Sequence, residues 1–232
     1  MIEFSDQQIN GYLNNLAING TGYLAYRDIL PLCLINNIDL SNVLDLGCGN
    51  GRSTIYLNSF CRSVSGTDIS KNLLDAAKSK LNANFFINDL SAKKYGRSQY
   101  TAVFSILMFF HLTTLQEINR ELMRCFRSLK KGGHLVVVSG TSNLYTRQYS
   151  TVKNCGTLPK KSGDIRKIYL SKIDTFVEDC YWSETDLINL AHECDFELRS
   201  LHYPVGKLED KQDYLDEFVY PPYFYLIFQR KS

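Results

Sequence analysis

The sequence predicts an α/β fold organised around a mostly parallel β-sheet, and three observations support this prediction. Short apolar runs alternate with helical patterns between residues 43 and 139, as repeated βαβ units require. The first run, residues 43–46, leads directly into a turn with glycine at three alternate positions. The run at residues 134–139 is largely apolar, which is typical of a strand that helices cover on both faces. A ligand crevice is expected at the carboxyl ends of the first and fourth strands, where the strand order reverses.

Length and composition favour one domain with a full hydrophobic core. The chain has 232 residues, of which 44% are apolar, and its net charge is only +2. A charge this small gives no overall electrostatic reason to expect nucleic acid as a partner. No apolar run approaches the ~18 residues of a membrane span, and the polar, acidic start at residues 1–10 is unlike a targeting signal.

The cysteines favour a reducing compartment. There are seven, an odd number, and none belongs to a C-x-x-C pair. This pattern argues against a disulfide framework and against a zinc site. We therefore expect reduced thiols, a cytoplasmic location and no metal.

The glycine turn at residues 47–51 predicts a ligand held close to the backbone. Glycine allows positive φ angles and has no Cβ, so a ligand can approach the N–H groups of the turn and of the helix that follows. A dinucleotide fingerprint G-x-G-x-x-G would need glycine where the chain has Arg52, and the lysine of a phosphate-binding G-K-[ST] loop is missing. Asp45, near the end of the strand, would repel a pyrophosphate and attract a cationic or amine-bearing ligand. These residues favour an adenosine that carries a positively charged tail.

The stretch at residues 43–51, V-L-D-L-G-C-G-N-G, resembles motif I of the class I S-adenosylmethionine (SAM)-dependent methyltransferases. The resemblance implies a Rossmann-like, doubly wound, seven-stranded sheet, mostly parallel, with a C-terminal antiparallel hairpin. It also implies SAM as cofactor, S-adenosylhomocysteine as its product, and methyl transfer to an N, O or C atom of a small-molecule acceptor. We expect one methyltransferase domain over residues 1–232: a helical lid at 1–40, the SAM-binding core at 41–140, and substrate-side loops, the last helix and the final strands at 141–232.

The segment before the first strand is expected to form helices. Apolar residues follow helical spacing at 9–16 and again at 23–36, and a Gly-Thr-Gly sequence separates the two patterns. In the resembled family this segment covers the ligand as a lid, which makes Tyr12, Tyr23 and Arg27 candidates to contact the SAM carboxylate or the substrate. Ordinary packing and a solvated arginine are the alternatives.

After the glycine turn, residues 52–60 are expected to form a helix and residues 63–69 the second strand. Asp68 lies 17 residues beyond Gly51, close to where βαβ geometry delivers a carboxylate to ribose hydroxyls. A carboxylate can accept two hydrogen bonds from a vicinal diol. Alternatively, Asp68 serves only the N-terminus of the next helix, whose expected cap is Ser70.

An acidic residue also ends the third strand, residues 83–89. Asp89 resembles the family's acid that meets the adenine amino group, and Leu90 the apolar residue that packs on the adenine ring; the alternative is a turn aspartate. Besides this pair, the resemblance implies a cofactor site made up of Tyr23, Arg27, Asp45, Gly47, Cys48, Gly49, Gly51, Asp68, Ile69 and Ile106.

The fourth strand, residues 100–107, is followed by Met-Phe-Phe-His-Leu at residues 108–112. This stretch resembles the small-molecule methyltransferases of the ubiquinone-biosynthesis type, in which a similar segment ends in one or two histidines. Those enzymes usually carry aspartate second in the strand, where this chain has Thr101. The resemblance makes His111 a candidate to line the methyl-transfer site, and capping of the next helix is the alternative.

The next helix is predicted from its caps. Thr114 and Glu117 form a capping box, and the helix is expected to end at the Lys-Lys-Gly-Gly sequence of residues 130–133, just before the fifth strand. Residues 140–179 are basic and aromatic without strong periodicity, and a solvated loop with a β-ribbon is favoured there over an RNA contact.

The C-terminal part is expected to add a helix and two strands. Ser183 should cap the helix, and residues 196–203 and 223–228 should form the strands that the family pairs as an antiparallel hairpin. Pro221-Pro222 precedes the last strand rather than following the fourth, and Tyr220 replaces the polar residue that a DNA adenine methyltransferase needs. We therefore expect a small-molecule acceptor and neither DNA nor a membrane as partner. Two alternatives stay open: a methyltransferase acting on RNA or protein, and a SAM-binding protein without catalysis.

Overall fold

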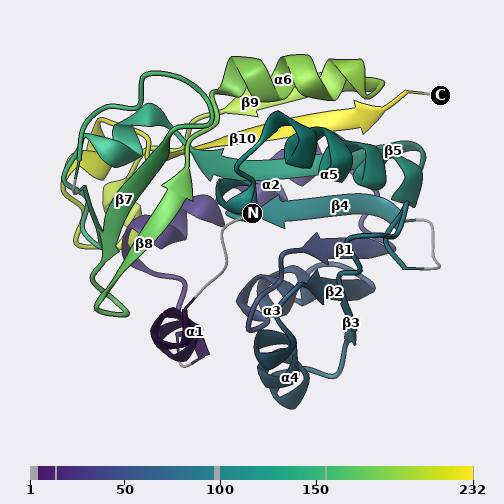
Figure 1. Ribbon diagram of the computed structural model, residues 1–232, viewed down its shortest axis with the longest axis horizontal. Helices are drawn as coiled ribbons and strands as arrows, with labels where there is room; N and C mark the ends of the chain where they lie inside the picture. The colour runs from purple at the N-terminus through teal and green to yellow at the C-terminus, as the bar shows by residue number, and fades with distance from the viewer. Residues whose placement is uncertain (1–4, 14, 97–99, 155, 232) are drawn as a thin grey trace.

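The computed structural model describes residues 5–13, 15–96, 100–154 and 156–231 of the chain. Seven strands form its main sheet: β1 (Val43–Leu46), β2 (Val64–Asp68), β3 (Asn84–Ile87), β4 (Tyr100–Ile106), β5 (Leu129–Gly140), β9 (Phe196–His202) and β10 (Tyr223–Arg230). Their order is β3-β2-β1-β4-β5-β10-β9 (Figure 1). Neighbours among β1 to β5 run parallel, whereas β10 is antiparallel to both β5 and β9. The predicted Rossmann-like sheet with a C-terminal antiparallel hairpin is confirmed.

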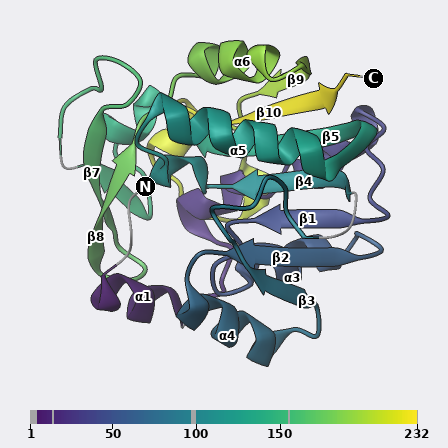
Figure 2. The ribbon, with the colours of Figure 1, turned by 45° about the vertical axis from the view of Figure 1, so that its right-hand side comes forward.

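Helices cover both faces of this sheet. The α-helices are α1 (Asp6–Leu13), α2 (Ile29–Ile35), α3 (Arg52–Asn58), α4 (Lys71–Lys80), α5 (Leu115–Ser128) and α6 (Glu184–Glu193). The 3-10 turns are η1 (Gly20–Ala25), η2 (Phe109–His111), η3 (Ser142–Tyr145), η4 (Leu208–Asp210) and η5 (Asp216–Phe218). Helices α5 and α6 pack together on one face, and α2 lies behind the sheet with η1 and α3 (Figures 1 and 2). No helix in the described ranges has the length and apolar character needed to cross a membrane.

Alternate residues of the central strands enter two separate cores. On β1, Val43 belongs to the core beneath α2 and α3, whereas Leu44 belongs to the core beneath α5 and α6. On β4, Phe104 and Val103 divide in the same way. Because successive side chains of a strand point to opposite faces, burial of both faces requires apolar residues at nearly every position. This is why the central strands were recognisable as short, mainly apolar runs.

The helix starts follow the predicted caps. Thr114 Oγ1 accepts a hydrogen bond from the Glu117 amide at 3.2 Å, and Ser183 Oγ accepts one from the Asp186 amide at 3.1 Å. The Ser70 hydroxyl does the same at the start of α4, at 3.4 Å. Each side chain satisfies an amide that the first helical turn leaves without a partner.

The end of α5 differs from the prediction. The helix ends at Ser128, and the Lys-Lys-Gly-Gly sequence lies inside β5 rather than forming the helix C-terminus. Leu129 is fully buried and pairs with Tyr100 of β4, so tertiary pairing outweighs the local capping signal. A Cβ on Gly133 would lie 2.9 Å from the Thr101 carbonyl oxygen, close to the irregularity in the β4–β5 register. Glycine is therefore needed here for close strand approach.

A second sheet stands at the carboxyl ends of the parallel strands (Figures 1 and 2). It consists of three antiparallel strands, β6 (Val152–Asn154), β7 (Ile165–Leu170) and β8 (Thr175–Cys180). The β-ribbon expected within residues 140–179 is thus present, with one more strand. Helix α1 packs against β8 on one side and α4 on the other, and so closes the edge of this region.

Candidate active site

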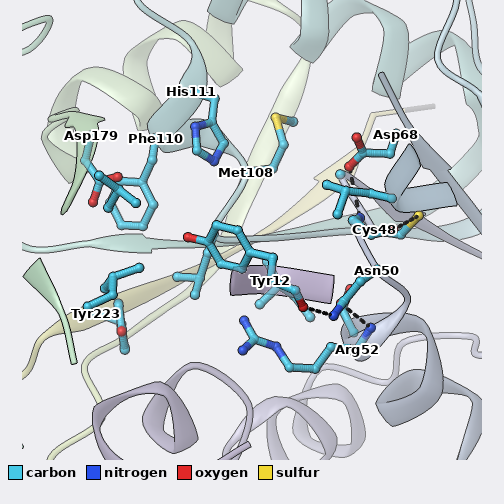
Figure 3. Close-up of a pocket in the computed structure, with 18 of the residues that line it drawn as sticks. Tyr12, Cys48, Asn50, Arg52, Asp68, Met108, Phe110, His111, Asp179 and Tyr223 are labelled. Atoms are coloured by element: carbon cyan, nitrogen blue, oxygen red, sulfur yellow. Dashed lines mark hydrogen bonds between the residues drawn. The ribbon is translucent and has the colours of Figure 1, made fainter. Parts of the chain in front are cut away.

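A cavity opens where the parallel strands end (Figure 3). Its floor is the glycine loop after β1 and the segment after β4, and its far wall is the second sheet. Asp68 and Cys48 lie at one end of the cavity, and Asp179 and Phe110 lie at the other. This is the crevice that the strand order of an open α/β sheet creates.

The three glycines of the loop have different roles. A Cβ on Gly49 would meet only one atom within 4 Å, Leu73 Cδ1 at 4.0 Å, so this position faces open space. A Cβ on Gly47 would lie 2.4 Å from Met108 Cγ, and one on Gly51 would lie 3.0 Å from Ala77 Cβ. All three residues have positive φ angles of +51° to +89°. Gly49 therefore keeps the cavity open, whereas Gly47 and Gly51 allow the chain to pack.

Asp45 holds the loop from beneath. Its Oδ2 accepts hydrogen bonds from the hydroxyls of Ser53 and Thr54, both at 2.6 Å, which ties the end of β1 to the first turn of α3. Burial raises the pKa of Asp45 to about 6, and the nearby Asp68 carboxylate adds to this effect. Oδ1 has no hydrogen-bond partner among the described residues. Asp45 does not line the cavity, so it shapes the loop and contributes negative potential behind it.

Asp68 ends β2 and does line the cavity. Its Oδ2 accepts a hydrogen bond from the Gly49 amide at 2.9 Å, and its Oδ1 accepts one from the Ser70 amide at 2.8 Å. Burial raises its pKa. Each carboxylate oxygen can accept a second hydrogen bond, so support of the next helix leaves capacity for a diol. The two roles weighed for Asp68 are therefore compatible.

His111 also lines the cavity, from η2. Burial lowers the pKa of its imidazole to about 4, so the ring is neutral at pH 7. Six predicted site residues meet around this cavity: Gly47, Cys48, Gly49, Asp68, Ile106 and His111.

Arg27 and Tyr23 lie elsewhere. The Arg27 guanidinium pairs with Asp28 at 2.8 Å and with Asp210 at 2.6 Å, and it donates a third hydrogen bond to the Val205 carbonyl at 3.0 Å. These contacts fasten η4 to the N-terminal segment, and neither Arg27 nor Tyr23 lines the cavity. The structure thus places Arg27 away from the predicted carboxylate contact, because nearby acids already engage its charge.

Three further predicted residues lie outside the cavity lining. The Asp89 carboxylate accepts hydrogen bonds from the Ser91 amide and hydroxyl, at 2.9 and 2.6 Å, as in a turn. Leu90 and Ile69 are 41% and 37% exposed. The structure therefore provides no enclosed adenine pocket at these positions.

Arg52 was not predicted as a site residue, but it lines the cavity at the start of α3. Its guanidinium lies 5.8 Å from the Tyr26 ring centroid and makes no ion pair with any described residue. Tyr12, which was expected to contact the ligand, lines the cavity as well. The Asn50 side chain donates to the Tyr12 carbonyl at 2.5 Å and so joins α1 to the glycine loop. The available signal for Arg52 was its position, where a dinucleotide-binding loop has glycine.

Asp179 on β8 was also missed. It lines the cavity at the end opposite Asp68 and is only 5% exposed. Burial raises its pKa to about 7. The available signal was an aspartate in the buried phase of an alternating strand, between exposed Glu178 and buried Cys180.

Comparisons with known proteins indicate a methyltransferase. Residues 43–133 match the family model of a methyltransferase domain. An uncharacterised methyltransferase of Schizosaccharomyces pombe is 28% identical over 205 residues, which cover 80% of this chain and 73% of the relative. A ubiquinone biosynthesis O-methyltransferase of Coxiella burnetii is 27% identical over 138 residues. That match covers 53% of this chain and just over half, 58%, of the relative.

Solved structures show the same fold. A SAM-dependent methyltransferase from Clostridium acetobutylicum superposes with a TM-score of 0.66 at 15% identity, covering 90% of this chain and 92% of that one. A putative SAM-dependent methyltransferase from Listeria monocytogenes gives a TM-score of 0.63 at 19% identity, covering 90% of this chain and 100% of that one. With the intact glycine motif and the family match, the chain is a class I SAM-dependent methyltransferase. Its cofactor is S-adenosylmethionine.

Proposed function

We propose that this enzyme transfers a methyl group from SAM to a small-molecule acceptor that enters the cavity beside the second sheet. The observation that supports this most directly is the shape of the cavity. It continues from the glycine loop and Asp68 into a mostly apolar chamber walled by Leu144, Ile168 and Val177. Such a chamber suits a compact apolar acceptor better than a polymer. The name of the Coxiella relative is consistent with an oxygen acceptor.

The domain organisation fits this proposal. Residues 1–40 act as a lid, residues 41–140 hold the cofactor, and residues 141–232 form the acceptor side. Support comes from α1, which lies between α4 and β8 and places Tyr12 over the cavity (Figure 3). A covered site excludes water and aligns the reactants, which is the main task of an enzyme when the leaving group is already activated.

The cofactor site fits S-adenosylmethionine. Open space at Gly49 admits a ligand close to the backbone, and Asp68 has acceptor capacity for ribose hydroxyls. We assign the carboxylate of the cofactor's amino acid part to Arg52, in place of Arg27. When bound, the cofactor supplies a methyl group on a positively charged sulfur.

S-Adenosylhomocysteine is expected to raise the melting temperature of this protein, and NAD is not. A ligand that binds only the folded state stabilises it by about 2.7 kcal/mol at a hundredfold excess over its dissociation constant. Differential scanning fluorimetry with each compound at saturating concentration checks this. No shift with S-adenosylhomocysteine, or an equal shift with NAD, would contradict the cofactor site.

Arg52→Met is expected to weaken S-adenosylhomocysteine binding at least about tenfold, because a hydrogen bond between charged groups contributes roughly 1.5–3 kcal/mol. Binding of 5′-methylthioadenosine, which lacks the carboxylate, should stay unchanged. Isothermal titration calorimetry measures both affinities.

Arg27→Met is the matched control, since it removes the same charge outside the cavity. It should leave both affinities intact and lower the melting temperature of the free protein, because Asp28 and Asp210 each lose an ion pair. If Arg27→Met instead weakened S-adenosylhomocysteine binding and Arg52→Met did not, Arg27 would be the carboxylate ligand after all.

A further inference from the structure

The second sheet turns one face toward the cavity, and the side chains of this sheet that line the cavity are apolar except at one position. Ile168 and Val177 are paired across β7 and β8, and both line the cavity. Asp179 lies two residues further along β8, on the same face, and lines the cavity too. The Asp179 carboxyl group therefore lies among aliphatic side chains that line the cavity, at the end of the chamber farthest from Asp68 (Figure 3).

The Asp179 carboxyl is buried without a partner among the residues that the structure describes. It is 5% exposed, and within the described part of the chain no donor reaches it within hydrogen-bonding distance and no cation pairs with it. Burying an ionised carboxylate in this way is costly, and a hydrophobic residue would fit the row better. A costly, unpartnered group that faces a ligand cavity indicates a role in function.

We propose that Asp179 accepts the proton of an acceptor hydroxyl during methyl transfer, and hence that the acceptor is an apolar molecule bearing that hydroxyl, such as a phenol. This inference rests on the proposed function. In the balanced step, the hydroxyl oxygen attacks with one lone pair and its proton passes to Asp179. The electron pair of the broken C–S bond stays with the departing sulfur, and the proton leaves to solvent after the product.

Asp179 suits this task better than His111 does. A general base is most effective when its pKa lies near the working pH. Burial raises the pKa of Asp179 to about 7, whereas burial lowers that of His111 to about 4. A neutral amine already presents its lone pair and needs no base, so a buried base favours a hydroxyl acceptor.

The groups around Asp179 leave its carboxyl free to titrate. Tyr12, Tyr145 and Tyr223 face it from α1, η3 and β10, and burial raises the pKa of each phenol, so all three stay neutral. Arg166, opposite on β7, is paired with Asp164 at 2.9 Å. The remaining ionisable groups nearby are Arg52 and His111 in the cavity and Cys180 on β8.

The test uses phenol and its methyl ether, anisole, as probes of the S-adenosylhomocysteine complex. Phenol can donate a hydrogen bond to Asp179 and anisole cannot. Above pH 7 the wild-type complex should bind phenol about tenfold more tightly than anisole, as expected for one hydrogen bond to a charged group. This preference should fade as the pH falls and Asp179 becomes protonated. Asp179→Asn should remove the pH dependence.

Glu178→Gln is the matched control, because it removes a neighbouring charge on the exposed face of the same strand. It should keep both the preference for phenol and its pH dependence. Methyl transfer to phenol should be lost in Asp179→Asn and retained in Glu178→Gln. Asp179→Asn should still be stabilised by S-adenosylhomocysteine, which shows that it is folded.

The outcomes separate this inference from the proposed function. If S-adenosylhomocysteine does not stabilise the wild-type protein, the proposed function fails. If S-adenosylhomocysteine does stabilise it, the role of Asp179 is overturned by either of two results. One is equal affinity for phenol and anisole, and the other is no detectable binding of either compound at concentrations up to about 10 mM. Tighter binding of benzylammonium than of phenol would also overturn it, because Asp179 would then recognise a cation.

Discussion

Asp179→Asn is expected to stabilise the free protein at pH 8 by as much as about 4 kcal/mol, which follows from three pKa units at 1.36 kcal/mol each. Burial raises the pKa of Asp179 from 3.8 to about 7 in the folded state. Between about pH 4 and about pH 7, Asp179 is therefore mostly protonated in the folded state and mostly ionised in the unfolded state. Stability contributed by this group falls as the pH rises from about 4 to about 7, and above that the carboxylate imposes its full cost.

Urea unfolding of wild type and variant at pH 4 and pH 8 measures the effect. At pH 4 the two proteins should differ by less than about 1 kcal/mol, because this pH lies close to the unfolded-state pKa of 3.8, so little of the cost of ionising Asp179 in the folded state has developed. Glu178→Gln, on the exposed face of the strand, should show no such change with pH. Asp45, whose pKa burial also raises to about 6, is present in every variant and cancels in the comparison. Equal stability of Asp179→Asn and wild type at pH 8 would mean that Asp179 finds a partner in solution.

This gain in stability would support the functional interpretation. Natural proteins retain destabilising buried groups where activity requires them, so a substitution that stabilises the fold while abolishing catalysis identifies a group kept for chemistry. A purely structural aspartate would behave in the opposite way, because its loss would leave partners unsatisfied.

The fold was predictable because its signals are local. Apolar runs, caps at Thr114 and Ser183, and the glycine turn each lie within a few residues of the feature they specify. The exception was the end of α5, where Leu129 joins β5 despite a good local stop signal. That choice depends on pairing with Tyr100, nearly thirty residues earlier, which local sequence does not reveal.

The site was predictable mainly at the carboxyl ends of the parallel strands. Gly49 and Asp68 follow from βαβ geometry, and both line the cavity. Arg27 lies outside the cavity lining, and its position was hard to foresee because its partner Asp210 lies 183 residues away in sequence. Asp179 was missed because its strand belongs to a second sheet whose position over the cavity only the folded structure reveals.

Asp68→Asn is expected to weaken S-adenosylhomocysteine binding by about tenfold to a hundredfold, because one of two charge-assisted hydrogen bonds to the ribose diol is lost. Asparagine is preferred to alanine here because the Gly49 and Ser70 amides both use this carboxylate. The asparagine amide would still face one of those two donors, so the variant should also be less stable when free.

A second ligand separates cofactor binding from loop support. The 2′,3′-dideoxy analogue of S-adenosylhomocysteine has no ribose diol, so it should bind wild type and Asp68→Asn with the same affinity if Asp68 contacts the diol directly. Calorimetry with both ligands and both proteins forms a double-mutant cycle, whose coupling energy isolates that contact. If the variant weakens both ligands equally, Asp68 acts only by holding Gly49 and Ser70, and the ribose is bound by other groups.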